Sequence, residues 1–109
     1  MKNNVIYKVC ITDITVKLCR NYTPYIEIKT ETLDSNYEVM KSLYYFSNKA
    51  KYFSYKELTN LLNMFNIETD EEHFFNSLNQ LIGKEVYLTE MPNIETKYQI
   101  YVDYKEKTL

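Results

Sequence analysis

Glycine, tryptophan and histidine are scarce in this 109-residue chain, which has one Gly, one His and no Trp. A loop that cradles phosphates needs several glycines close together, so a P-loop and a dinucleotide-binding loop are both excluded. His73 is the only imidazole and no GxSxG motif occurs, so the sequence shows no recognisable set of nucleophile, base and orienting group of a hydrolase. We therefore expect a protein that binds a partner rather than an enzyme.

Cysteine is also rare, because only Cys10 and Cys19 occur and they form no CxxC pair. A structural zinc site usually takes four ligands, which two Cys and one His do not supply. The acidic run at residues 68–72 could hold a divalent cation, but acids are also favourable at a helix N-terminus. We expect no metal and no cofactor, and two reduced cysteines that serve as small buried apolar residues.

Long apolar runs are missing as well. No stretch approaches the roughly 20 apolar residues that span a bilayer, and none follows Met1 as a secretory signal would require. Asn, Lys, Ile and Tyr are frequent, a bias typical of AT-rich genomes of bacteria and their viruses. The expected location is the cytoplasm of a bacterial host cell, without a membrane partner.

Charge and aromatic content are what the chain does offer. It has 12 Tyr and 5 Phe, and its net charge of −2 is divided unevenly. Residues 1–58 hold nine Lys/Arg and six Asp/Glu, whereas residues 59–109 hold four and nine. A basic first half can meet phosphates and an acidic second half would avoid them, unless both are simply mixed, solvated surfaces.

The first half of the chain reads as three strands. Residues 5–19 alternate in polarity, but the apolar positions change from odd to even numbers near Thr12 and Asp13. This predicts a β-bulge or bend within one long strand, or else a tight turn between two short ones. Alternation at residues 25–32 and 37–46, after short turns, completes a predicted antiparallel meander.

Two helices are predicted next. Ser54 and Thr69 are each followed three residues later by Glu, which fits two capping boxes. Gly83 then stands where a helix end needs a left-handed residue. The apolar residues with helical spacing are Leu58, Leu61, Leu62 and Phe65 in the first helix, and Phe74, Phe75, Leu78, Leu81 and Ile82 in the second.

The closing segment predicts two more strands, at residues 85–89 and 98–104, with a hairpin loop that begins at Met91. The whole chain, 1–109, is thus expected to be one α+β domain, with strands in about 5–46, helices in about 48–82 and a closing hairpin in about 85–104. This order fits a five-stranded OB-like antiparallel barrel, whose first strand is bent and shared by both sides. A half-open sheet with two helices, inserted between strands 3 and 4, on one face would give the same order.

Three segments carry a resemblance to a known family: residues 47–53 (SNKAKYF), 64–67 (MFNI) and 81–88 (LIGKEVYL). In layout, from about residue 5 to 104, the chain resembles small phage-encoded single-stranded-DNA-binding proteins of OB-fold type. In those proteins an L-x-G-K-x-V step leads from the helical insertion to the last hairpin. The resemblance implies an OB-fold and binding of single-stranded DNA.

Nucleic-acid binders of this kind combine a basic groove with aromatic rings on which bases stack. Tyr25, Glu27 and Lys29 alternate with Ile26 and Ile28, so their face should be exposed to solvent. The resemblance carries base or phosphate contacts to Tyr25, Lys29, Tyr37 and Tyr45, with Lys17 and Arg20 flanking them.

Two other functions fit the same residues. The first is an inhibitor that binds a host protein or nucleoprotein complex, as anti-CRISPR proteins do, since Tyr is enriched at protein interfaces. Its acidic residues would mimic DNA phosphates, the candidates being Glu68, Asp70, Glu71 and Glu72. The second is an assembly subunit, a homodimer formed through an exposed sheet edge.

Overall fold

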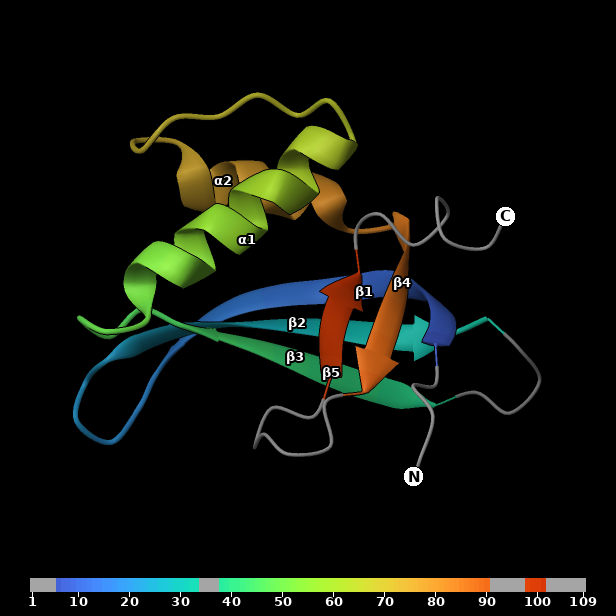
Figure 1. Cartoon of the computed structure of the whole chain (residues 1–109), viewed down its shortest axis with the longest axis horizontal. Coiled ribbons are helices and arrows are strands. Elements are labelled where there is room, and N and C mark those ends of the chain that lie inside the picture. Colours follow the sequence, from blue (N-terminus) through green and yellow to red (C-terminus); the bar gives the residue numbers. More distant parts are fainter. Residues whose placement is uncertain (1–5, 34–37, 91–97, 102–109) are drawn as a thin grey trace.

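The computed structural model describes residues 6–33, 38–90 and 98–101. The strands are β1 (Ile6–Leu18), β2 (Pro24–Thr32), β3 (Val39–Tyr45), β4 (Glu85–Glu90) and β5 (Tyr98–Tyr101). The helices are α1 (Lys51–Met64), α2 (Phe74–Leu78) and the short 3-10 turn η1 (Asn79–Leu81). Both α-helices lie on one side of the strands (Figure 1).

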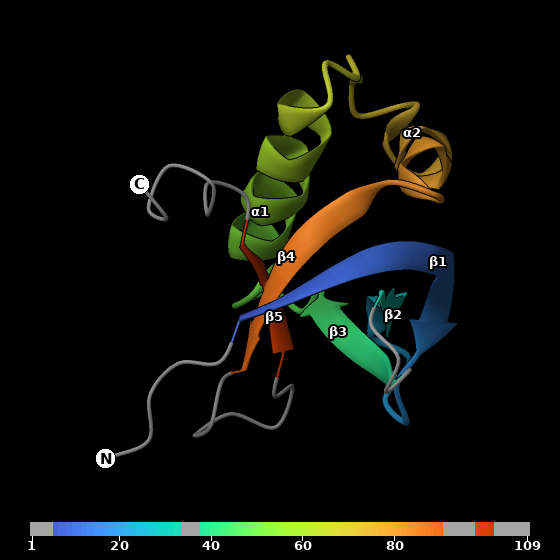
Figure 2. The ribbon, with the colours of Figure 1, turned by 90° about the vertical axis from the view of Figure 1, so that its right-hand side faces the viewer.

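The strands pair antiparallel in the order β3-β2-β1-β4-β5. β1 bends sharply below α2, so that β4 crosses the direction of β2 and β3 steeply (Figures 1 and 2). The sheet is therefore a curled half-barrel rather than a flat layer. The prediction of an α+β protein with a curled antiparallel sheet and two helices is confirmed at this level.

The bend of β1 comes from a bulge, as the change of apolar phase predicted. The pairing of β1 with β2 shifts by one residue between Ile11 and Asp13. Thr12 is the extra residue, and its hydroxyl donates to the carbonyl of Lys29 at 3.2 Å. One continuous strand is thus observed instead of two short strands joined by a turn.

A single cluster of buried apolar side chains joins the helices to the concave side of the sheet. The sheet contributes Val9, Ile11, Ile26, Ile28, Met40, Tyr44, Val86 and Leu88, and the helices contribute Leu58, Leu61, Leu62, Phe74, Leu78 and Leu81. Most predicted inner positions of both helices are thus confirmed, and Phe65 packs against this cluster as a partly buried residue. Phe75 and Ile82, also predicted to face the core, are 48% and 43% exposed. Ile82 follows η1 in an extended conformation, so the helical spacing no longer applies to it.

The prediction of Ser54 as the N-cap of the first helix was wrong. α1 begins at Lys51, with Ala50 at the N-cap, and Ser54 lies buried inside the first turn. The Ser54 hydroxyl donates to the carbonyl of Tyr45 at 2.7 Å, so it ties α1 to β3. Ser47 stabilises the turn that precedes α1, because its hydroxyl accepts from the backbone N–H of Ala50 at 3.2 Å.

The second helix is also shorter than predicted from Thr69. α2 starts only at Phe74, after a turn that Asp70 closes by accepting the backbone N–H of His73 at 2.9 Å. Asp70 rather than Thr69 therefore provides the side-chain acceptor. The expectation for Gly83 is confirmed, since its φ of +95° is a conformation that side chains with a Cβ rarely adopt.

Some expectations fall outside the described residues: the strand position of Tyr37, the hairpin loop at Met91, and the end of the last strand at Val102 and Tyr104. Within the described residues, no helix has the length and apolar character needed to cross a membrane. The third strand is observed over Val39–Tyr45, inside its predicted range.

Candidate functional site

The convex face of β1, β2 and β3 brings several candidate residues into rows that run across the strands. Lys17 pairs with Tyr25, and Tyr25 pairs with Tyr45 on its other side. Four residues further along β2, Lys29 pairs with Lys41 of β3. Side chains at successive alternate positions share a face, so one surface holds two tyrosines beside three lysines. We call this surface the Tyr/Lys face.

Tyr25 and Tyr45 form a cross-strand aromatic pair at one end of the Tyr/Lys face. Their ring centroids are 5.3 Å apart and the ring planes are tilted by 36°. Both side chains are half-buried, so each keeps part of its surface open to solvent. Aromatic pairs at this spacing contribute about 0.5–1.5 kcal/mol beyond their area burial, which holds the two rings in a defined position.

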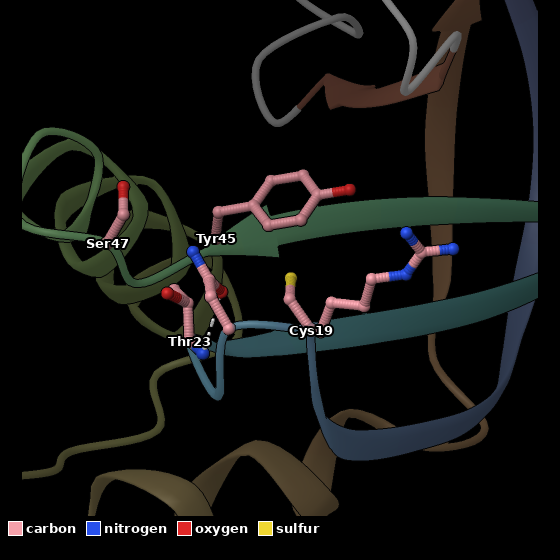
Figure 3. Close-up of a pocket in the computed structure, with 6 residues that line it drawn as sticks. Cys19, Thr23, Tyr45 and Ser47 are labelled. Atoms are coloured by element: carbon pink, nitrogen blue, oxygen red, sulfur yellow. Dashed lines mark hydrogen bonds between the residues drawn. The ribbon is translucent and has the colours of Figure 1, made fainter.

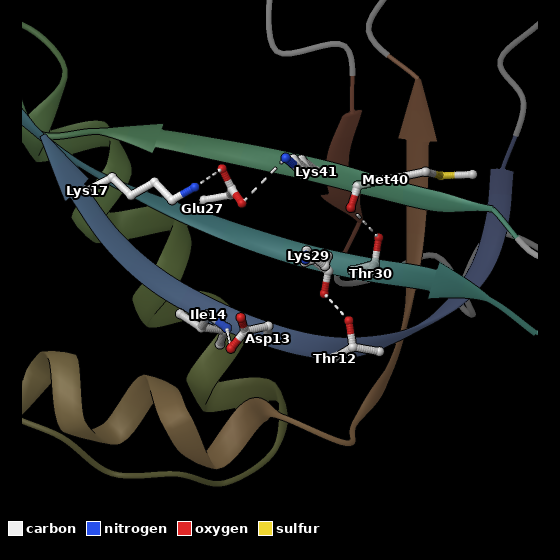
Figure 4. A network of polar contacts seen from close by, with 9 residues as sticks. All are labelled: Thr12, Asp13, Ile14, Lys17, Glu27, Lys29, Thr30, Met40 and Lys41. Atoms are coloured by element: carbon white, nitrogen blue, oxygen red, sulfur yellow. Dashed lines mark hydrogen bonds and ion pairs between the residues drawn. The ribbon is translucent and has the colours of Figure 1, made fainter. Parts of the chain in front are cut away.

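Glu27 occupies the middle of the Tyr/Lys face and was wrongly predicted to be solvent-exposed. Its side chain is only 9% exposed, because Lys17 and Lys41 cover its carboxylate from the two neighbouring strands. The Lys17 ammonium lies 3.2 Å from one carboxylate oxygen, and the Lys41 ammonium lies 3.8 Å from the other (Figure 4). The carboxylate therefore fixes the position of two ammonium groups and neutralises one of them.

The remaining predicted cations lie at opposite ends of the Tyr/Lys face. Lys29 is half-buried in β2, whereas Arg20 is exposed in the turn between β1 and β2. Together with Lys17 and Lys41, Lys29 and Arg20 give this surface four cations. Three acidic residues lie on the same strands: Asp13, Glu27 and Glu31. The positive excess on this surface is therefore small.

An open pocket of about 400 Å³ adjoins the tyrosine pair at the turn between β1 and β2 (Figure 3). Its lining residues are Cys19, Arg20, Asn21, Thr23, Tyr45 and Ser47. The Asn21 side chain accepts the backbone N–H of Thr23 at 3.2 Å, which stabilises the turn that forms one wall. Cys10 and Cys19, both expected to be buried, are half-buried free thiols.

The structure thus brings together Lys17, Arg20, Tyr25, Lys29 and Tyr45 on one side of the sheet, and Tyr37 lies outside the described residues. The sequence-based assignment of contacts left out Lys41 and missed the role of Glu27 in this surface. The signal that could have found Lys41 was the alternation of β3, which places residues 41, 43 and 45 on one face.

The acidic candidates lie elsewhere, in the connection between α1 and α2 on the helical side of the molecule (Figure 1). All four carboxylate residues, Glu68, Asp70, Glu71 and Glu72, are exposed. Two contacts with His73 hold the pKa of Asp70 below its usual value. The larger effect comes from the hydrogen bond that the His73 backbone N–H donates, and the smaller from the ring nitrogen Nδ1, which lies 2.9 Å from the carboxylate. His73 therefore serves a local turn, and no three His, Cys, Asp or Glu of the described residues gather closely enough to hold a metal ion.

Comparisons with known proteins leave the family open: no protein-family model matches the chain, and no curated protein sequence matches it significantly.

Proposed function

We propose that this protein binds single-stranded nucleic acid, DNA in the first place, on the Tyr/Lys face of β1, β2 and β3. The observation that carries the proposal is the Tyr25–Tyr45 ring pair, half-exposed and flanked by the ammonium groups of Lys17 and Lys41. Bases stack on such rings whatever their identity, and phosphates take the cations. The proposal assigns no catalytic step to the protein.

The proposed architecture is an OB-like barrel with a helical insertion between β3 and β4. The pairing order supports it, since β1 joins β2 on one side and β4 on the other, and β3 approaches β5. Closure between β3 and β5 would complete a five-stranded barrel with the bulged β1 shared by both halves. In such barrels the outer surface around strands 2 and 3 contacts oligonucleotides, and here that surface is the Tyr/Lys face.

A bound strand would run across the three strands, from the tyrosine pair toward Lys29. One base would stack on Tyr25 or Tyr45, and the pocket beside Tyr45 would take the neighbouring nucleotide with Arg20 on its phosphate. Lys29 and Lys41, paired across β2 and β3, would hold a phosphate further along. A guanidinium is well suited to the first of these contacts because it can donate two parallel hydrogen bonds to a phosphate.

The direct experiment is a fluorescence-anisotropy titration of a labelled oligo-dT at low and at moderate salt. We expect saturable binding that weakens as salt rises, because each phosphate contact releases counterions and contributes about −0.7 to the slope of log K against log salt. Reversing two charges, Arg20→Glu with Lys29→Glu, should abolish this binding. The control Lys56→Glu, an exposed lysine on α1, should leave it unchanged. Salt-independent binding, or equal loss in both variants, would contradict the proposed surface.

Removing the charge of Glu27 is expected to strengthen binding. Glu27→Gln keeps the size of the side chain but frees the ammonium groups of Lys17 and Lys41 for phosphates. Because partly exposed ion pairs are worth about 0.2–1 kcal/mol each, we expect a gain of roughly two- to tenfold at low salt, and a steeper salt dependence. Glu72→Gln, which removes a charge from the helical side, is the matched control. Weaker binding by Glu27→Gln would mean that the lysines act only when Glu27 positions them.

The exposed carboxylates of residues 68–72 support a second candidate function, an inhibitor that occupies the nucleic-acid channel of a host complex. This function requires no affinity for oligo-dT. Glu71→Lys with Glu72→Lys should then abolish inhibition of the host complex and spare the Tyr/Lys face. If these two substitutions leave inhibition of the host complex unchanged, the acidic residues are not the inhibitory surface.

A further inference from the structure

The second half of β1 has one edge without a partner strand among the described residues. β2 pairs along the whole segment from Asp13 to Leu18, whereas pairing with β4 stops at Cys10. Ile11 makes the last bonds on that side, accepting from Gly83 at 2.7 Å and donating to Lys84 at 2.9 Å. Figure 2 shows this part of β1 beyond its bend, at the border of the molecule with β2 on its other side.

The hydrogen-bond alternation tells which backbone groups face this open edge. Cys19 donates its backbone N–H to Thr23 across the turn, so every second residue of β1 before it also bonds to β2. The backbone groups of Ile14, Val16 and Leu18 therefore point away from β2. In agreement, the Ile14 N–H donates to the carboxylate of Asp13, at 3.0 Å.

The same segment exposes apolar side chains. Val16 is 55% and Leu18 is 60% exposed, although their partners on β2 include the fully buried Ile26. Both side chains lie on the concave side of the sheet, beyond the part that the helices cover. A strand with an open edge and exposed apolar side chains is a surface on which another strand can pair.

We propose that this edge pairs with the same edge of a second copy of the chain, antiparallel, with the two-fold axis at Thr15. In this register Asp13 lies opposite Lys17 of the second copy, and Lys17 lies opposite Asp13 of the second copy. Ile14 lies opposite Val16, again twice. The segment is thus complementary to itself in charge and in apolar character, as an isologous interface requires.

The neighbouring registers lack this complementarity. An axis at Val16 places Thr15 opposite Lys17 and leaves Asp13 without a cation. An axis at Ile14 places Asp13 opposite Thr15. Only the axis at Thr15 gives two opposite-charge pairs directly across the strands, which contribute favourably to pairing. It also places Ile14 and Val16, whose backbone groups face the edge, in hydrogen-bonded positions.

The pairing would bring the two Tyr/Lys faces side by side, with both copies of Lys17 at the junction. It stands independently of the proposed nucleic-acid binding, because it rests on the open edge and on the self-complementary residues along it. One strand pair of this length is a small interface, and small interfaces are typical of weak association. A concentration-dependent dimer is therefore expected.

Charge exchange tests the register. Sedimentation of the 13.2 kDa chain over a range of concentrations should show a monomer–dimer equilibrium. Asp13→Lys and Lys17→Asp should each raise the dissociation constant of the dimer at least tenfold, since each substitution places like charges opposite one another. The double exchange should restore the dissociation constant of the unaltered chain. A wild-type chain that stays monomeric, or a double variant that stays as monomeric as the single ones, would overturn the proposal. Circular dichroism of each variant separates misfolding from loss of pairing.

A disulfide tests the axis. Residues directly opposite in a non-hydrogen-bonded pair have Cα atoms about 4.5 Å apart, within the range that a disulfide spans. Thr15→Cys in a background of Cys10→Ser and Cys19→Ser should therefore form a covalent dimer under mild oxidation. Lys56→Cys, on α1, should not. Equal cross-linking at both positions, or none at Thr15→Cys, would contradict an axis at this residue.

Discussion

Tyr25→Ala is expected to weaken binding of single-stranded oligonucleotides by roughly 5- to 150-fold, because stacking of one base on an aromatic ring is worth about 1–3 kcal/mol. Tyr25 lies between Lys17 and Tyr45 in one cross-strand row, so its ring has a cation on one side and a second ring on the other. Its loss also removes the ring against which Tyr45 packs at 5.3 Å. The measurement is the anisotropy titration with oligo-dT at fixed, low salt.

Two variants separate stacking from other effects of this substitution. Tyr25→Phe keeps the ring and should bind within about threefold of the unaltered protein, because stacking does not need the hydroxyl. Tyr52→Ala removes a tyrosine that is 76% exposed on α1, outside the Tyr/Lys face, and should not change affinity. If Tyr25→Phe binds as poorly as Tyr25→Ala, the contact is a hydrogen bond rather than a stack.

The salt dependence of Tyr25→Ala provides a further check. Since the substitution removes no charge, the slope of log K against log salt should remain unchanged while the affinity falls. Arg20→Glu with Lys29→Glu should instead change both. An altered slope in Tyr25→Ala would indicate that the ring positions the cations, and that the proposed division between stacking and phosphate contacts is wrong.

The sequence was informative about β1 because alternation is a local property. A strand has a side-chain period of two, so the change of apolar phase after Asp13 can only arise from an extra residue or a break. The same reasoning predicted that Gly83 takes a positive φ, since that conformation depends on the residue itself. Both features are seen in the structure.

Burial of Glu27 could not be predicted in this way, because its cause lies on two other strands. Alternation placed Glu27 correctly on the face opposite Ile26 and Ile28, but only the register reveals that Lys17 and Lys41 cover it. Residues 17 and 41 are far apart in sequence and meet only through β2. The exposure of Val16 is the reverse case, an apolar residue on the concave side that no helix reaches.

The N-cap of the first helix could not be predicted from the sequence for a related reason. A capping-box pattern identifies a serine that is able to cap, yet two serines, Ser47 and Ser54, precede the apolar stripe of α1. The choice between them depends on a tertiary bond, the one from the Ser54 hydroxyl to the carbonyl of Tyr45. Because Ser54 is buried, its hydroxyl needs a hydrogen-bond partner, and the carbonyl of Tyr45 provides one only when Ser54 lies inside the helix.

Leu58→Ala is expected to cost about 2–5 kcal/mol of unfolding free energy, the usual range for emptying a fully buried leucine site. Leu58 is completely buried, at 0% exposure, in the middle of α1, where the helix packs on the sheet. Alanine has the higher helix propensity, so the loss can only come from packing. The free energy of unfolding of a small domain is about 5–15 kcal/mol in total, so this substitution should remove a large part of the stability.

The measurement is thermal and urea unfolding followed by circular dichroism, with Leu33→Ala as the matched control. Leu33 is 49% exposed just beyond β2, so its truncation should change stability by less than about 0.5 kcal/mol. At roughly 4–8 °C per kcal/mol for a chain of this size, Leu58→Ala should lower Tm by at least about 8 °C. Equal effects of the two substitutions would mean that α1 does not pack on the sheet through Leu58. The proposed binding face would then lack the support that holds β2 and β3 in their curled arrangement.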